Sequence, residues 1–464
     1  MSADQVSTNP ASPSVQKPAE ATPDAAPPAP KKRGWIATIG LGFLGLLVLL
    51  GLSAVVLKVI YKDLTIGHTD KGTPPSVPET ADKPLDAIHK GVAYLQLNQE
   101  EDGNFSRGLL DPKPAMTAMV VEALAGGNLG YSSNDEFMQK AIKAILAEQK
   151  EDGAIVKYGF QSQLGNYITC ICVNALAALK DPRYQPNLDK ARDYLRSLQR
   201  KKVEGDPNSG GVGYGGPGKV DGNNAAAWVE AMHNAGVKSD DPAMKNAKEF
   251  FDRLSNNTEI NPPNPEFDWE PNNDGSFMYR YGSATEGVPD ETSRTGKRMP
   301  RGYGMMSYNG LKTFLILDIP KDDTRIRKAM EWIKANYTLD ENRNVGKKGL
   351  FYTYLIMAKA LALNGDRILQ VTASDAPGGP GPKDWAKDMT ERLLKLQKAD
   401  GSWRNDWNSG WMEDDPILVT AYAVRTLIVC REFMQSHPLP DEKPTAPPAN
   451  VTPKMKQAPA KSEK

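Results

Sequence analysis

The sequence is poor in cysteine and histidine and has no excess of either charge. Three cysteines in 464 residues are too few for a framework of disulfide bonds. Cys170 and Cys172 stand two positions apart on a predicted helix, so they point to different faces and cannot easily bridge each other. Lysine plus arginine and aspartate plus glutamate both total 57, so formal charge gives no reason to expect a nucleic acid partner.

Long apolar runs are also scarce, with one exception near the N-terminus. Residues 34–57 read GWIATIGLGFLGLLVLLGLSAVVL, which is 24 residues without a charge. Such a run makes a helix about 36 Å long, enough to cross the hydrocarbon core of a bilayer. We predict an uncleaved transmembrane helix over 34–61, because no small-x-small cleavage site clearly follows the run. Lys31, Lys32 and Arg33 favour a cytoplasmic N-terminus and an extracytoplasmic domain after the span.

The flanking segments are polar and biased in composition. Residues 1–33 are rich in proline, alanine, serine and lysine, and residues 438–464 form a Pro/Lys/Ala tail. Both are predicted to be disordered, because such compositions bury too little apolar surface to fold. Residues 62–82 are predicted to be a linker, which leaves 83–437 as the working domain.

One short pattern recurs through this domain. Its clearest copy is LLKLQKADGSW at 393–403, where an apolar helical stretch is followed by glutamine, Asp-Gly and an aromatic residue. Fainter copies begin at Gln99, Gln149, Gln199 and Asn272. A repeated pattern of this kind indicates that the domain is built from one helical unit used several times.

Each copy lies between two helical patterns, which form six pairs. The first helices start near residues 84, 135, 187, 242, 323 and 383, and the second near residues 115, 166, 224, 305, 350 and 416. The second helices are more apolar, so they are predicted to be buried and the first ones to lie outside. Six outer–inner pairs predict an all-α fold, an (α/α)6 barrel of six helical hairpins preceded by one transmembrane helix.

The residues of the repeated pattern have a structural explanation. Gly401 allows the left-handed turn that ends an outer helix. Gln397 can offer its amide to backbone groups left unpaired at a helix end, and Trp403 can cover that amide while burying its own ring. We therefore predict that each copy fixes an outer helix to the inner helix that follows, and that its role is stability.

The pattern Gln-x-x-Asp-Gly-x-Trp after an apolar helix resembles the repeats of squalene–hopene cyclases, and related repeats occur in protein prenyltransferase β-subunits. The resemblance covers about residues 83–432, although only 393–403 matches closely. It implies an α/α toroid with a central cavity. It says much less about activity, because the same fold serves different functions.

The catalytic residues of both families are degenerate in this sequence. The resemblance to class II cyclases implies an Asp-x-Asp-Asp motif, and the segment that resembles it most is Val220–Ala226, VDGNNAA. Asn223 then stands where the proton donor belongs, and an amide has no proton of useful acidity. The resemblance to prenyltransferases implies a zinc site, but Asn223 replaces its cysteine and Val419 its histidine. Only Asp221 is left as a catalytic candidate, and neither a metal nor another cofactor is expected.

A second acidic candidate is the segment Trp411-Met-Glu413-Asp414-Asp415-Pro416. Asp415 has the position of an N-cap, with Pro416 as the first residue of the last inner helix. A cap does not explain Glu413 and Asp414. Crowded carboxylates near a cavity can raise one another's pKa, so these two residues are candidates for a catalytic acid.

Aromatic residues fall within the first two turns of the inner helices, where they would surround one mouth of the cavity. They are Tyr167, Trp228, Tyr308, Tyr352, Tyr354 and Tyr422. Of these we take Tyr167, Trp228, Tyr308 and Tyr354, together with Trp411, as candidate substrate-binding residues. The alternative is that these rings pack between the inner and outer layers, which periodicity alone does not exclude. All inner-helix N-termini point to this mouth, which would suit an anionic group.

Residues 256–304 lie between the helices of the fourth pair and are too long for an ordinary connection. They are either a lid over the mouth or a surface insertion. For the whole protein, the sequence favours a membrane-anchored toroid that binds an isoprenoid, another lipid or a different small apolar or anionic ligand. Two alternatives stay open: an active terpenoid cyclase or prenyltransferase with a non-standard acid, and a carbohydrate-active α/α barrel. No protein partner is indicated.

Overall fold

The computed structural model describes residues 74, 77, 79–106, 112–126, 129–157, 163–215, 218–261, 267–268, 273–283 and 291–440. The predicted transmembrane helix 34–61, the N-terminal segment 1–33 and the tail after residue 440 lie outside these residues. Among the described helices, none is long and apolar enough to cross a membrane.

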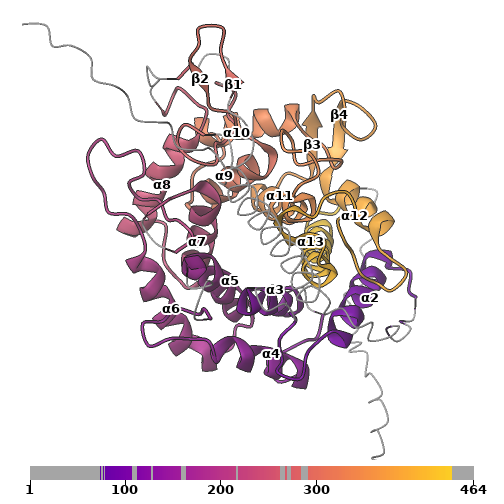
Figure 1. Ribbon diagram of the computed structural model, residues 1–464. Helices are drawn as coiled ribbons and strands as arrows, with labels where there is room; N and C mark the ends of the chain where they lie inside the picture. The colour runs from indigo at the N-terminus through magenta and orange to yellow at the C-terminus, as the bar shows by residue number, and fades with distance from the viewer. Residues whose placement is uncertain are drawn as a thin grey trace, which may run out of the picture. The chain divides into compact units, whose positions relative to one another are not determined.

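Twelve α-helices of the described residues alternate between an outer and an inner layer (Figure 1). The outer helices are α2 (Lys83–Leu97), α4 (Glu136–Leu146), α6 (Gln185–Ser197), α8 (Pro242–Leu254), α10 (Thr324–Ala335) and α12 (Trp385–Leu396). The inner helices are α3 (Lys113–Ala125), α5 (Gly165–Ala178), α7 (Gly222–Asn234), α9 (Gly304–Ile316), α11 (Leu350–Asn364) and α13 (Pro416–Ser436).

The two layers close on themselves. Each inner helix packs against the next one along the chain, and α13 packs back against α3. In the outer layer α12 packs against α2, so the last pair joins the first. The predicted ring of six outer–inner hairpins is therefore confirmed.

The composition of the helices explains their layers. On α8 the buried residues Ala243, Met244, Ala247, Phe250 and Phe251 recur at helical spacing, and polar residues fill the other face. On the inner helix α5, by contrast, nearly every residue from Ile168 to Leu176 is buried. A helix that is apolar nearly all round must be covered on all sides, and the outer layer supplies that cover.

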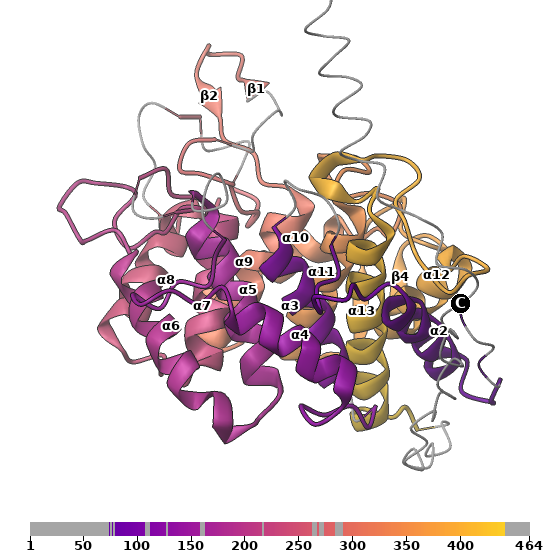
Figure 2. The ribbon, with the colours of Figure 1, turned by 60° about the horizontal axis from the view of Figure 1, so that its bottom comes forward.

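Two short antiparallel β-hairpins occur in the connections between the helices. One pairs β1 (Glu291–Thr292) with β2 (Arg298–Met299), and the other pairs β3 (Ile368–Val371) with β4 (Gly381–Asp384). Figure 2 shows the β1–β2 hairpin projecting from one end of the helical ring. It belongs to the long connection between α8 and α9.

The repeated pattern joins three helices rather than two. Trp403 holds its own outer helix through an indole N–H bond to the Leu393 carbonyl oxygen at 2.8 Å. The backbone N–H of Trp403 donates to the hydroxyl of Thr420, on the following inner helix, at 3.0 Å. The Gln397 amide donates to the Gly401 carbonyl oxygen in the turn after its own helix, as predicted, and it also donates to the carbonyl oxygen of Ala87 on the next outer helix, which was not predicted.

The same bonds recur around the ring. Gln99, Gln149 and Gln199 donate to the first turns of the following outer helices, at the carbonyl oxygens of Phe137, Asn187 and Ala243. The predicted left-handed turn at Gly401 is confirmed by its φ of 86°. A Cβ at Gly401 would lie 2.5 Å from the Lys90 carbonyl oxygen, so the glycine also permits the close approach of α2.

Candidate functional site: a tyrosine-lined cavity

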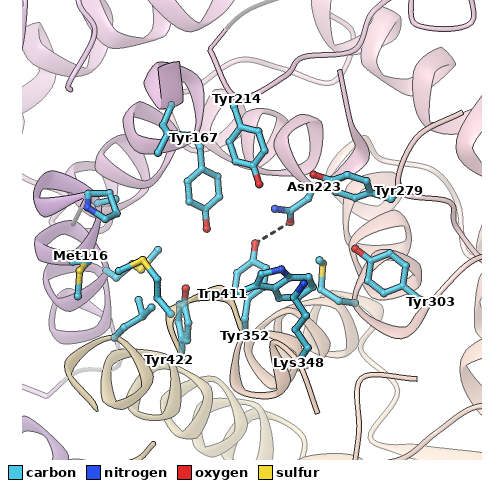
Figure 3. A pocket seen from close by; sticks show the side chains of 17 residues that line it. Met116, Tyr167, Tyr214, Asn223, Tyr279, Tyr303, Lys348, Tyr352, Trp411 and Tyr422 are labelled. Carbon is cyan, nitrogen blue, oxygen red and sulfur yellow. Dashed lines mark hydrogen bonds between the residues drawn. The ribbon is translucent and has the colours of Figure 1, made fainter. Parts of the chain in front are cut away.

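A cavity of about 450 Å³ lies where the inner helices begin (Figure 3). Its walls combine the first two turns of inner helices with the loops that lead into them. This volume is within the range of about 300–1,000 Å³ that is usual for small-molecule sites. The predicted cavity at the N-terminal ends of the inner helices is therefore present.

Tyrosines form much of its polar surface. Tyr167, Tyr352 and Tyr422 come from the inner helices α5, α11 and α13, and Tyr214 and Tyr279 come from loops. In Figure 3 the hydroxyl groups of Tyr167, Tyr214 and Tyr352 point toward the centre of the cavity. The cavity can therefore offer several hydrogen bonds to one ligand from different sides.

Burial keeps these phenols neutral. Removal from water is the largest effect on Tyr167, Tyr352 and Tyr422, and it raises the pKa of each above its usual value. Glu230 adds to the rise in the pKa of Tyr352, and Glu413 adds to that of Tyr422. At neutral pH the three hydroxyls are thus protonated and able to donate.

Apolar side chains also contribute to the lining. They are Met116 and Met119 of α3, together with Leu164, Met305 and Leu418. Thioether side chains are flexible and polarisable, so they adapt to ligands of irregular shape. The cavity therefore combines adaptable apolar surface with groups that can form hydrogen bonds.

Asn223 also lines the cavity. Its side-chain oxygen accepts bonds from the Tyr352 hydroxyl at 3.1 Å and from the Asn309 amide nitrogen at 3.2 Å. The position that the cyclase resemblance assigns to a proton donor thus faces the cavity, but it carries an amide. An amide at this place can orient a ligand and cannot protonate it.

Asp221 does not line the cavity. Its carboxylate is fully buried and caps α7, with one oxygen accepting from the Asn224 backbone N–H at 2.9 Å and the other from the Asn224 amide at 2.8 Å. Burial raises the pKa of Asp221 to about 6, although these bonds oppose the rise. The structure therefore places this catalytic candidate in a helix cap behind the cavity wall.

Glu413 also serves as a cap, for a helix far away in the sequence. One oxygen of its buried carboxylate accepts from the Tyr352 backbone N–H, at the start of α11, and the other from the Asn405 amide, both at 2.7 Å. Burial raises the pKa of Glu413 to about 7. The raised pKa was expected, but its cause is burial and not the crowding of carboxylates.

The two neighbouring acids have separate environments. Asp414 is exposed and does not line the cavity, so the structure does not place this candidate acid in a carboxylate cluster at the cavity. Asp415 accepts from the backbone N–H groups of Ile417 at 2.7 Å and Leu418 at 3.3 Å. The predicted N-cap of α13 is confirmed.

Three of the five candidate substrate-binding residues lie outside the cavity lining. The Trp228 indole donates to the Leu195 carbonyl oxygen of the outer helix α6, and the Tyr354 hydroxyl donates to the Leu339 carbonyl oxygen. Tyr308 is likewise buried away from the cavity. These rings pack between or beside the layers, as the alternative interpretation held, whereas Tyr167 and Trp411 do line the cavity.

Trp411 closes part of the mouth in a strained conformation. It has a φ of 60° and is followed by Met412 with a φ of 62°, values that are uncommon for residues other than glycine. Its ring leaves no space for a Cβ at Gly349, whose Cβ would lie 1.9 Å from a ring carbon. Lys348 stands beside it, with its ammonium 5.4 Å from the ring centroid.

The connection between α8 and α9 covers part of the cavity. Tyr279 and Tyr303 both line it, and Phe277 is buried beneath them against α9. This arrangement favours the predicted cover over a surface insertion. Other parts of the connection, including Trp269, lie outside the described residues.

Sequence reasoning missed Tyr214, Tyr279, Tyr303 and Lys348, which all belong to loops. Tyr214 and Tyr303 stand next to glycines, in GVGYGG and RGYGM, shortly before inner helices. That combination was a usable signal, because glycine-rich loops bring side chains over a helix terminus. Within the described residues, no group of three or more His, Cys, Asp or Glu side chains is placed to hold a metal ion.

Comparison with known proteins gives a family match for part of the chain. Residues 106–213 match the squalene–hopene cyclase C-terminal domain. The helical domain of this chain is a toroid that resembles the terpenoid cyclases. The matched segment ends before Asp221 and Asn223, so it does not include the position of the missing proton donor.

The similar solved structures are distant. A variant of the type II terpene cyclase MstE from Scytonema is 15% identical, with 76% of this chain and 98% of that chain covered and a TM-score of 0.45. A family 76 glycoside hydrolase from a bovine Bacteroides thetaiotaomicron strain is 14% identical, with 75% and 77% covered and a TM-score of 0.48. A protein from Actinoplanes is 13% identical, with 75% and 99% covered and a TM-score of 0.44. Among curated protein sequences there is no significant match.

Proposed function

We propose that the toroid binds a small, largely apolar ligand of isoprenoid type in the tyrosine-lined cavity and does not protonate it. The observation that carries the proposal is the lining itself. Among the described residues it combines methionines, aliphatic side chains, neutral phenols, the Trp411 ring, the Asn223 amide and a single ammonium group, that of Lys348, and it contains no carboxylate. Such a surface suits an apolar body with one or more oxygen atoms that accept hydrogen bonds.

The absence of an acid from this lining separates the proposal from its first alternative. A cyclase with a non-standard acid would use Glu413 or Asp221, whose raised pKa values are suitable for proton transfer. Both carboxylates, however, have their oxygens engaged by helix N-termini and side-chain amides. Neither points a free oxygen at the ligand in this arrangement.

The second alternative, a carbohydrate-active barrel, requires a pair of carboxylates in the cavity. Most glycosidases place two carboxylates on either side of the bond they cleave, about 5–10 Å apart. The described lining of this cavity offers none. Its tyrosines could stack on sugars, but the chemistry of cleavage has no candidate pair.

We further propose that the protein is anchored in a membrane by residues 34–61, with a cytoplasmic N-terminus and the toroid on the other side. The uncharged run and the preceding Lys31, Lys32 and Arg33 support this proposal. Protease added to intact cells should then digest the toroid domain. Full protection of the domain, with digestion only after the cells are opened, would reverse the orientation.

Binding is tested with the full chain in detergent and with geranylgeraniol as the probe. Met116→Trp fills the cavity and should weaken binding at least tenfold, whereas Leu363→Trp is the matched control because its side chain is 49% exposed and outside the cavity. Equal affinity in both variants and the unmodified protein would refute binding in this cavity. Mass spectrometry of lipids that co-purify with the unmodified protein, and are lost from Met116→Trp, would identify the natural ligand.

A further inference from the structure

Five charged side chains meet inside the inner layer, away from the cavity lining. They come from five inner helices and are Glu122, Glu230, Lys312, Lys359 and Arg425. The Lys312 ammonium is 2.6 Å from Glu230, and the Lys359 ammonium bridges Glu122 at 2.8 Å and Glu230 at 2.9 Å. Arg425 adds a longer contact of 3.8 Å to Glu122. We call this set the ionic layer.

The ionic layer has a fixed relation to the cavity. Each of its members stands seven positions after a cavity-lining residue on the same helix, and these lining residues are Ala115, Asn223, Met305, Tyr352 and Leu418. Seven residues make nearly two full turns, so both members of each pair face the same way. The ionic layer is therefore stacked about 10 Å beyond the first turn of the cavity.

The sixth inner helix follows the same spacing with an uncharged residue. Seven positions after Tyr167 on α5 comes Asn174, which is buried and accepts a hydrogen bond from the Asn234 amide at 3.0 Å. All six inner helices thus place a polar residue at this level. The ionic layer and Asn174 together extend across the inside of the ring.

The ion pairs favour the charged forms of Glu230 and Lys359, whereas burial lowers the pKa of Lys312 in spite of its contact with Glu230. Burial opposes the ionisation of Glu230, but Lys312 and Lys359 outweigh it and hold the pKa of this carboxyl well below its usual value. Burial likewise disfavours the charged form of Lys359, but Glu122 and Glu230 raise its pKa. Separating such partners in a largely buried layer leaves uncompensated charges, which is costly.

We infer that the ionic layer is the blind end of the cavity and limits the length of the ligand it accepts. The inference rests on the proposed binding function. A ligand that enters past Trp411 cannot push an apolar end between Glu230, Lys312 and Lys359, because its carbon atoms cannot replace the ionic contacts it would break. Glu230 and Lys312 are then specificity-determining residues although neither lines the cavity.

The test compares binding of geraniol, farnesol and geranylgeraniol, which differ only in the number of isoprene units. The variant Glu230→Ala/Lys312→Ala removes one charge of each sign and opens space below the cavity. Its ratio of affinities for geranylgeraniol and farnesol should rise at least tenfold over that of the unmodified protein. Glu230→Gln/Lys312→Met removes the ionic contacts but keeps the space filled, and its ratio should rise by a smaller factor than that of the alanine variant.

Two controls keep the inference falsifiable. Lys202→Ala/Glu249→Ala removes a surface ion pair and should leave the ratio unchanged. If the alanine variant of the ionic layer does not fold, Asn174→Ala opens a smaller space at the same level and should shift the ratio in the same direction. An unchanged ratio in a folded alanine variant, or in Asn174→Ala when the former does not fold, overturns the inference. Failure of all three alcohols to bind the unmodified protein would instead refute the proposed function.

Discussion

The amide nitrogen of Gln397 donates a hydrogen bond to the carbonyl oxygen of Ala87 at 2.9 Å, although the two residues are 310 positions apart. The same nitrogen donates to the Gly401 carbonyl oxygen at 3.0 Å. One side chain therefore holds the turn of the last repeat and the first outer helix together. It is part of the closure of the ring.

Removal of this amide should weaken the domain. Gln397→Ala leaves two partly buried carbonyl oxygens without their donor, which should lower the free energy of unfolding by about 1–3 kcal/mol. Gln149→Ala removes the equivalent bonds inside the ring and should cost a similar amount. Denaturant titration of both variants measures this, and an unchanged midpoint for Gln397→Ala would show that ring closure does not depend on the amide.

Replacement of the tryptophan of the same repeat should lower the stability more than replacement of Gln397. Trp403 is fully buried, so Trp403→Ala removes a large ring and leaves a cavity, at a cost of about 3–5 kcal/mol. Trp407 is 46% exposed and serves as the control, because Trp407→Ala should change the stability by less than about 1 kcal/mol. Equal effects would contradict the assignment of Trp403 to the core.

Asp221 should make stability depend on pH. Its pKa is raised to about 6 in the folded protein, so between about pH 4 and pH 6 the folded state holds a proton that the unfolded state has released. The unmodified protein therefore loses stability as the pH rises through this window. Asp221→Asn keeps a capping oxygen and has no such loss. The free energy of unfolding of the variant, relative to that of the unmodified protein, should therefore be about 2–3 kcal/mol higher at pH 7.5 than at pH 4. A relative value that does not change with pH would contradict the raised pKa.

Replacement of the neighbouring residues Glu413 and Asp414 by alanine should affect the stability of the domain differently. Glu413→Ala leaves the Tyr352 N–H and the Asn405 amide without their acceptor and should destabilise the domain by about 2 kcal/mol. Asp414 is exposed, so Asp414→Ala should change the stability by less than about 0.5 kcal/mol. Thermal unfolding of the two variants distinguishes them directly. If Asp414→Ala were the more harmful change, the cap assigned to Glu413 would be wrong.

Removal of residues 1–62 should release the protein from the membrane fraction, because the only long apolar run is then gone. Fractionation of cells that express the shortened chain checks this, with circular dichroism to confirm a helical fold. A shortened chain that stays with the membranes would show that the toroid surface itself binds lipid.

The sequence predicted the arrangement of helices better than the directions of their side chains. The apolar run around Cys170 and Cys172 could only be a buried helix, and Gly401 after a helix could only mark its end. Large aromatic residues, however, occur both on the side of an inner helix that faces the cavity and on the side that faces the outer layer. Trp228 and Tyr354 were therefore indistinguishable from Tyr167 until their partners, the Leu195 and Leu339 carbonyl oxygens, were known.

The meeting of the loop tyrosines at one cavity was not predictable from the sequence, for another reason. Tyr214 and Tyr279 lie 65 positions apart in the chain, and periodicity does not describe the path of a loop. They meet at one cavity because the ring brings the starts of successive inner helices together. Glu413 was chosen as an acid from its neighbours in sequence, yet its environment is set by α11, which is distant in sequence.

Closure of the ring has a consequence for synthesis on the ribosome. Arg431, in the last helix, forms an ion pair of 2.8 Å with Asp82, directly before the first helix. The first outer helix, α2, therefore cannot pack against α12 and α13 until almost the whole domain has been translated. Until then one side of the growing arc exposes apolar surface that the finished protein hides, and this makes the nascent chain prone to aggregation. A chaperone that shields α2 and α3 during translation would act at the step where this architecture is most vulnerable.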